Sequence, residues 1–96
     1  MELSQGDYKI VFTKEYFKKE TKFFIKHPNL RTKYQKMLSI LSANPKHPSL
    51  RLHKLNGKMQ NCYSISIDLS YRVIISFIVK NNQIFPIDIG DHDIYH

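Results

Sequence analysis

Residues 61–96 read NCYSISIDLSYRVIISFIVKNNQIFPIDIGDHDIYH, and this stretch decides the fold. Within residues 63–68, Tyr and Ile alternate with Ser and Asp, which is the period of two expected of a strand with one face turned inward and the other outward. Residues 71–79 are apolar at almost every position except Arg72 and Ser76. A run of that kind is typical of a central strand that is covered on both faces.

A third strand follows after a tight turn. Residues 81–82 are both Asn, which tolerates the positive φ of a hairpin turn, and residues 83–89 return as a strand that Gly90 ends. The tail beyond it is dense in titratable groups and places an imidazole and a phenol three positions apart, in His92 and Tyr95.

A first strand at residues 8–12 and an amphipathic helix are expected upstream. Thr13 is a good N-cap for this helix, and His27 ends it because a residue before proline is disfavoured in the α region. Lysines occupy the polar side of the helix. Its apolar stripe is aromatic and consists of Tyr16, Phe17, Phe23 and Phe24.

A second helix follows, with Asn29 as its expected cap and the Asn-Pro pair at residues 44–45 as its end. Its apolar positions recur with the helical period and are Leu30, Tyr34, Met37, Leu38 and Leu41. Residues 50–55 then precede an Asn-Gly turn signal at residues 56–57 and are expected to form another strand. The expected order is therefore one strand, two helices and an antiparallel meander.

With 96 residues, the chain is long enough for one hydrophobic core, so we expect a single domain over residues 1–96. We expect an α+β fold in which both helices pack on one face of the sheet. The other face is then expected to be a concave basic surface.

Charge is the most uneven feature of the composition. The formal net charge is +7, and no Asp or Glu occurs between residues 21 and 67, where nine Lys or Arg and three His residues lie. Such a surface favours a polyanion or an acidic protein as a partner, and the alternative is a basic face that only aids solubility. The single Cys62 and the absence of a signal sequence or an apolar membrane span indicate a cytoplasmic protein with no membrane partner.

The residues that could carry chemistry point away from metal or cofactor use. There is no metal-ligand spacing and no glycine-rich phosphate loop. What remains is a set of five side chains, His53, Lys54, Arg72, His92 and Tyr95. Such a set suits cleavage of RNA through its own 2′-hydroxyl, in which a base takes the 2′ proton, a cation stabilises the phosphate and an acid protonates the leaving 5′ oxygen. His53 or His92 is the better candidate for the base.

Structural roles are the alternative for the same residues. Arg72 could pair with Asp68 or Asp88, His53 could be a turn residue, and Tyr95 could close the core.

The chain resembles the RelE/ParE superfamily of type II toxin-antitoxin toxins, nearest to the RelE and YafQ-like mRNA interferases. The resemblance covers two basic helices, then LRLHKLNG at residues 50–57, YSISI at 63–67, YRVII at 71–75 and IDIGDHDIY at 87–95. The last of these is the most specific, because a strand ending in Gly followed by x-His-x-x-Tyr is similar to the C-terminal active-site signature of the family. It implies a RelE-like sheet that is similar to those of microbial ribonucleases.

The resemblance also implies roles for individual residues. His92 is similar to the acid–base histidine of the tail, and Tyr95 to the aromatic that stacks on or orients a base. Arg72 matches the arginine that contacts the scissile phosphate, and His53 a catalytic histidine of YafQ-like members. The expected substrate-binding residues near the Asn-Gly turn are Arg51, Lys54 and Lys58. The carboxylate base of YoeB-like members is missing, so the identity of the base stays open.

The implied activity is that of a ribosome-dependent endoribonuclease that cleaves translated mRNA in the ribosomal A site without a metal. The implied partner is a cognate antitoxin with an acidic, partly disordered segment, through which the complex binds operator DNA. One alternative is a ParE-like inhibitor of DNA gyrase that catalyses nothing, and another is a non-catalytic RNA- or ribosome-binding module that uses the basic helices alone.

Overall fold

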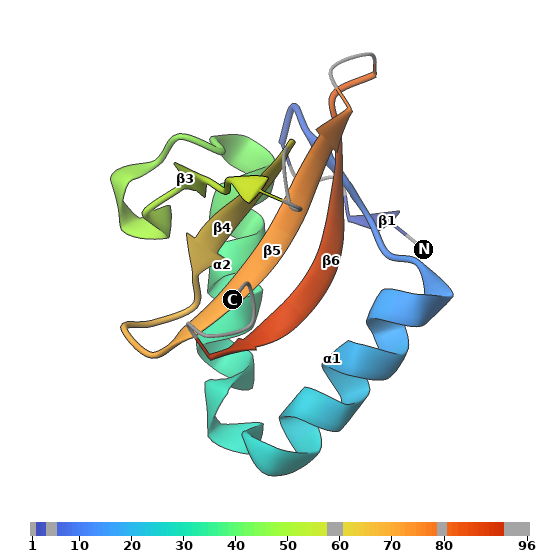
Figure 1. The fold of residues 1–96 in the computed structure, drawn as a ribbon, viewed down its shortest axis with the longest axis vertical. Helices are drawn as coiled ribbons and strands as arrows, with labels where there is room; N and C mark the ends of the chain where they lie inside the picture. The colour runs from blue at the N-terminus through green and yellow to red at the C-terminus, as the bar shows by residue number, and fades with distance from the viewer. Residues whose placement is uncertain (1, 4–5, 58–60, 79–80, 92–96) are drawn as a thin grey trace.

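A six-stranded sheet forms the centre of the fold. The structure is a computed structural model that describes residues 2–3, 6–57, 61–78 and 81–91. Figure 1 shows the two longest strands side by side in the sheet. Across the sheet the order of the strands is β1 (Glu2–Leu3), β2 (Lys9–Val11), β6 (Gln83–Asp91), β5 (Tyr71–Ile78), β4 (Cys62–Ser66) and β3 (His53–Lys54).

Two helices cover one face of this sheet, as the sequence predicts. In Figure 1, α2 (Arg31–Ala43) lies behind β4 and β5, whereas α1 (Lys14–Lys26) packs beside β6. Two short 3₁₀ turns, η1 (Pro28–Leu30) and η2 (Pro48–Leu50), follow the helices. The buried side chains of both helices join those of the sheet in one core, so the expected α+β class is confirmed.

The sequence predicted the antiparallel meander but not the pairing of the N-terminal strand. Strands β3 to β6 form the expected antiparallel meander. Strand β2, however, lies parallel to β6, with Ile10 opposite Ile84. Both helices and the strands β3 to β5 lie between β2 and β6 in the chain, so the connection is long enough for a parallel pair. Strand β1, which the sequence did not indicate, pairs with β2 in the antiparallel sense.

Helix α1 begins and ends where the sequence predicts. The Thr13 side chain accepts a hydrogen bond from the backbone N–H of Tyr16 (3.1 Å), and His27 is the C-cap. Tyr16, Phe23 and Phe24 are buried, but the inclusion of Phe17 in the buried stripe was wrong, because its side chain is 52% exposed. A position next to Tyr16 is turned about 100° around the helix axis, which carries Phe17 out of the core.

Helix α2 starts later than predicted. Asn29 lies inside the turn η1, so it does not cap α2; the N-cap is Leu30, which provides no side-chain hydrogen bond. The residue after Pro28 enters a 3₁₀ turn first, as is frequent at the start of α-helices. The apolar stripe of α2 was predicted correctly, and all five of its side chains are buried.

The strand expected over residues 50–55 is much shorter. Leu50 ends the turn η2, and only His53 and Lys54 pair with β4. Arg51 has a left-handed backbone (φ 50°), which breaks the extended run before it can pair.

The middle of the sheet is covered on both faces. Val73, Ile74 and Ile75 are all fully buried, as expected of β5. The serines of β4 were expected to face outward into solvent, but Ser64 and Ser66 are buried as well. The alternation of apolar and polar residues predicted that the serine face is exposed, and it does not show whether that face is covered by other parts of the chain.

The hairpin between β5 and β6 matches the sequence. Asn81 and Asn82 have positive φ values (75° and 52°). Strand β6 continues through Gly90 to Asp91, one residue beyond the glycine that was expected to end it. A β-bulge between Ile74 and Ile75 shifts the register of this pair of strands.

A buried hydrogen-bond chain joins the two helices. The hydroxyls of Tyr16 and Tyr34 lie 2.8 Å apart, and Tyr34 donates to Oε2 of Glu20. Because a phenol has one proton, Tyr16 must be the donor to Tyr34. Burial raises the pKa of both phenols well above the usual range, so both stay protonated in the folded protein.

The segment before β2 is bound to the C-terminal end of α2. The Ser42 hydroxyl accepts from the backbone N–H of Gly6 (3.1 Å) and donates to the carbonyl of Tyr8 (2.7 Å). A Cβ at Gly6 would lie 2.6 Å from the Cα of Ala43. No side chain fits in that space. Among the described residues, no helix is long and apolar enough to span a membrane.

Candidate functional site

Arg72 lies on the sheet face opposite the helices. On β5 it alternates with Val73, which belongs to the core on the helix side. It is directly opposite Ser66 on β4 and Gly90 on β6. Its Nη1 donates a hydrogen bond of 3.0 Å to the Ser66 hydroxyl, while glycine adds no side chain on the other flank. Within the described residues, the guanidinium is therefore held from one side only.

Neither carboxylate expected as an alternative partner is bonded to Arg72. The Oδ1 of Asp68 accepts from two backbone N–H groups of the following turn (2.8 and 2.9 Å), and the Oδ1 of Asp88 accepts from the N–H of Ile89 (2.9 Å). Within the part of the chain that the structure describes, the only hydrogen bond found for the guanidinium is the one to the neutral Ser66. The positive charge of Arg72 is thus not compensated there.

One donor of the guanidinium is also unused. The Nε of Arg72 is buried and has no hydrogen-bond partner among residues 2–3, 6–57, 61–78 and 81–91. A buried charged donor without a partner is costly, of the order of 1–3 kcal/mol. An anionic ligand such as a phosphate would supply both the missing acceptor and the missing charge.

His53 shares the face of Arg72. On β3 it is directly opposite Ser64 on β4, two residues from the Ser66 that faces Arg72. Residues two apart on one strand lie on the same face. With strands about 4.8 Å apart, the Cα atoms of His53 and Arg72 are separated by roughly 12 Å. Two long side chains at that separation can contact one bound phosphodiester.

A second unpartnered polar atom lies between them. Ser64 is fully buried, and its Oγ has no hydrogen-bond partner in the described ranges. The row across the sheet runs from His53 through Ser64 to Ile74. The face that carries the predicted histidine and arginine therefore also holds an unsatisfied hydroxyl, which the sequence analysis did not identify as part of the site.

The predicted substrate-binding residues are not all on this face. Lys54 is in register with Tyr63, which packs against the core on the helix side, so it lies on the face opposite to His53. Arg51 is exposed at the end of η2, two residues before the start of β3. The prediction for Arg51 is compatible with this position, whereas Lys54 would have to reach round the edge strand.

Three of the predicted site residues, Lys58, His92 and Tyr95, lie outside the described residues. In the ranges that are described, no group of three or more His, Cys, Asp or Glu side chains is placed to hold a metal ion.

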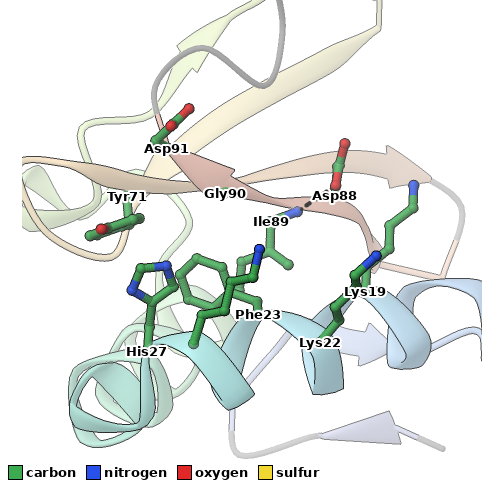
Figure 2. Close-up of a pocket in the computed structure, with 10 residues that line it drawn as sticks. Lys19, Lys22, Phe23, His27, Tyr71, Asp88, Ile89, Gly90 and Asp91 are labelled. Atoms are coloured by element: carbon green, nitrogen blue, oxygen red, sulfur yellow. Dashed lines mark hydrogen bonds between the residues drawn. The ribbon is translucent and has the colours of Figure 1, made fainter.

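The structure also contains a cleft that the sequence analysis missed. It has a volume of about 540 Å³ and lies between α1 and the ends of β5 and β6. Figure 2 shows its side chains, with Lys19, Lys22 and His27 rising from the helix toward the strand. The only sequence signal was the spacing of Lys19, Lys22 and Lys26 on one side of α1, and the sequence could not show that this side flanks a strand end.

Comparison with known proteins identifies the fold through structure alone. No known family profile and no curated protein matches the sequence. Among solved structures, YafQ from E. coli strain BL21(DE3) matches with a TM-score of 0.71 and 13% identity, over 88% of this chain and 93% of that one. The YoeB-YefM complex from Staphylococcus aureus matches with a TM-score of 0.67 and 20% identity, over 88% and 97%.

A second toxin-antitoxin complex is also similar in structure to this chain. The E. coli DinJ-YafQ toxin-antitoxin complex has a TM-score of 0.70 and 16% identity, over 90% of this chain and 93% of the matched one. The resemblance seen in the sequence is therefore confirmed at the level of structure, and the chain has the fold of the YafQ and YoeB toxins.

Proposed function

We propose that this protein is the toxin of a type II toxin-antitoxin system, and that it arrests translation by cleaving mRNA on the ribosome. The fold it shares with YafQ and YoeB supports this proposal. So does the basic surface of a chain with a formal net charge of +7, which suits an RNA substrate.

The observation that carries the proposal is the state of Arg72. Its guanidinium is fixed by the neutral Ser66, has a buried Nε without a partner in the described ranges, and lies on the same sheet face as His53. A structural arginine would be expected to pair with a nearby carboxylate. An arginine that is held but not neutralised is suited to a phosphate.

The proposed reaction is attack of the ribose 2′-oxygen on the adjacent phosphorus. A histidine, His53 or His92, takes the 2′ proton, and an acid returns a proton to the 5′ oxygen as the phosphorus–oxygen bond breaks. Arg72 stabilises the charge that develops on the phosphate oxygens. Tyr95 is proposed to orient a base, and Arg51, Lys54 and Lys58 to contact the flanking RNA.

The proposed protein partner is an antitoxin. The YoeB-YefM and DinJ-YafQ structures are complexes of a toxin with its antitoxin. The stretch without carboxylates between residues 21 and 67 offers a surface to an acidic, partly disordered segment. Operator DNA would then be bound through the antitoxin.

The test is induction of the chain without antitoxin, followed by primer extension across abundant transcripts. We expect growth arrest with new mRNA ends inside translated codons. Free RNA is expected to be cut weakly, because the ribosome supplies the substrate geometry. Arg72→Ala should lower cleavage at least about hundredfold, and Lys14→Ala, on the first turn of α1, is the matched loss of one positive charge and should leave cleavage unchanged.

Two outcomes would reject the proposal. Growth arrest with intact mRNA and induced DNA-damage signalling would indicate a gyrase inhibitor. Equal arrest by the Arg72→Ala and wild-type proteins would show that the uncompensated guanidinium has no part in toxicity.

A further inference from the structure

The cleft between α1 and the ends of β5 and β6 lies outside the proposed catalytic face. Its volume of about 540 Å³ is in the range of ordinary ligand sites. Tyr71 lines this cleft from the residue next to Arg72 on β5, and Gly90 lines it from the position directly opposite Arg72 on β6. Adjacent residues on a strand face opposite sides. The cleft and Arg72 therefore flank the same end of the sheet from its two sides.

One wall of the cleft is a row of ammonium groups. Lys19, Lys22 and Lys26 are all exposed and come from successive turns of α1. Seven residues of helix put about 10 Å between the first and the last of them. Figure 2 shows Lys19 and Lys22 rising from the helix toward β6. The row forms an extended cationic wall and not a single point of charge.

The inner end of the cleft is aromatic. The centroid of the His27 ring lies 4.6 Å from the ring centroid of Tyr71 and 4.6 Å from that of Phe23. The ring centroids of Phe23 and Tyr71 are 5.5 Å apart. Phe23 is buried, whereas His27 and Tyr71 are half-exposed. Figure 2 shows the three rings together below β6. Two accessible rings are thus supported by a third that is fixed in the core.

The backbone that carries two of these rings is itself held by hydrogen bonds. The N–H of His27 donates to the carbonyl of Phe23 (3.0 Å), and the N–H of Tyr71 donates to Oδ1 of Asp68 (2.9 Å). A rigid aromatic surface loses little entropy when a flat group stacks on it.

Two carboxylates also line the cleft, but they are turned away from the rings. Figure 2 shows Asp88 and Asp91 on the far side of β6 from His27 and Phe23. The Oδ1 of Asp88 is bonded to the backbone N–H of Ile89. The lysine wall therefore dominates the charge on the side of the rings.

The edge of β6 is poorly suited to pairing with a peptide strand at this point. Lys19 Nζ donates to the carbonyl of Ile87 (3.3 Å), and Pro86 has no N–H to offer. Strand addition needs both free donors and free acceptors on the edge. A ligand with phosphates for the lysines and flat rings for the aromatic end fits better than an acidic peptide.

We propose that this cleft binds single-stranded RNA, with its lysines on the phosphates and a base stacked on His27 and Tyr71. The idea that this RNA is part of the strand cleaved at Arg72 rests on the proposed function. The binding of RNA in the cleft does not. RNA that passes the end of β5 and β6 would contact the cleft on one side and Arg72 on the other.

The test uses a short fluorescein-labelled oligoribonucleotide with 2′-O-methyl riboses, which cannot be cleaved through a 2′-hydroxyl. Fluorescence anisotropy is measured with the purified full chain. The double variant Lys22→Glu/Lys26→Glu should bind at least about tenfold more weakly and show a weaker salt dependence. The control Lys14→Glu/Lys18→Glu makes the same charge change on the same helix outside the cleft, and should cost no more than about threefold.

Stacking is tested separately with an abasic oligonucleotide that keeps all its phosphates. His27→Ala should weaken binding of the normal oligonucleotide about tenfold and leave binding of the abasic one unchanged. Circular dichroism of each variant confirms folding. If His27→Ala unfolds the chain, stacking is tested by NMR of the unmodified protein. The normal oligonucleotide should then shift the signals of the His27 ring, and the abasic one should not.

Three results would overturn the proposal: equal losses in the two lysine double variants, equal binding of the normal and abasic oligonucleotides, or displacement of RNA by a glutamate-rich peptide of the same charge at the same concentration. The last result would make the cleft a protein-docking surface. None of these results bears on mRNA cleavage by the chain, so the two proposals can fail independently.

Discussion

The hydroxyl of Ser66 on β4 accepts a hydrogen bond of 3.0 Å from Nη1 of Arg72, which lies directly opposite on β5. It is the one side-chain hydrogen bond that holds the guanidinium within the described part of the chain. A buried serine on a sheet face thus sets the direction of the proposed phosphate-binding group.

Replacing Ser66 with Ala should therefore impair activity more than stability. The methyl group fits the same space, so the free energy of unfolding should change by less than about 1.5 kcal/mol. Arg72 loses its anchor, and mRNA cleavage after induction should fall about tenfold. Ser66→Thr keeps the hydroxyl and should retain most of the activity. Full activity in Ser66→Ala would show that Arg72 needs no such support.

Phe17 and Phe24 give a direct test of which aromatics form the core. Phe24 is buried and Phe17 is 52% exposed. Phe24→Ala should lower the free energy of unfolding by about 3–5 kcal/mol, whereas Phe17→Ala should change it by less than about 0.5 kcal/mol. Urea denaturation of both variants measures the difference. Comparable losses in the two would place Phe17 in the core, as the sequence pattern alone predicts.

The difference between these two residues illustrates what the sequence could predict about the fold. The helical period located both helices, and the cap at Thr13 located the start of α1, because both signals depend only on neighbouring residues in the sequence. The parallel pairing of Ile10 with Ile84 is not local, since both helices and the strands β3 to β5 separate the two residues in the sequence. The burial of Ser64 could not be predicted either, because a small polar residue is compatible with both faces of a strand.

The candidate site shows the same limit. Arg72 was identifiable because an arginine interrupts an apolar strand, and His53 because it precedes a turn. They share a sheet face because His53 pairs with Ser64 and Arg72 pairs with Ser66 on the strand between them. The period of the sequence does not specify this pairing register. The same register puts Lys54 on the other face, although it is adjacent to His53 in the sequence.

Gly6 tests the attachment of the N-terminal segment to α2. In Gly6→Ala the new Cβ would lie 2.6 Å from the Cα of Ala43, and backbone atoms cannot move away as a flexible side chain can. We expect a loss of about 1–3 kcal/mol in the free energy of unfolding by urea. Gly57→Asn is the control, because its φ of 69° is accessible to Asn and a Cβ there meets nothing within 4 Å. Equal effects of the two changes would contradict this packing.

The buried phenols of Tyr16 and Tyr34 should make stability fall at alkaline pH. Burial raises the pKa of both above the unfolded value of about 10. Above that pH the unfolded chain loses these protons and the folded chain keeps them. The free energy of unfolding should then fall by up to about 1.4 kcal/mol per pH unit for each phenol. Below a pH of about 10 neither phenol makes stability depend on pH. Urea denaturation between pH 9 and pH 11 measures the slope. The double variant Tyr16→Phe/Tyr34→Phe retains every other titrating group, so its decline should be shallower by that amount. An unchanged slope would mean that the phenols ionise alike in both states.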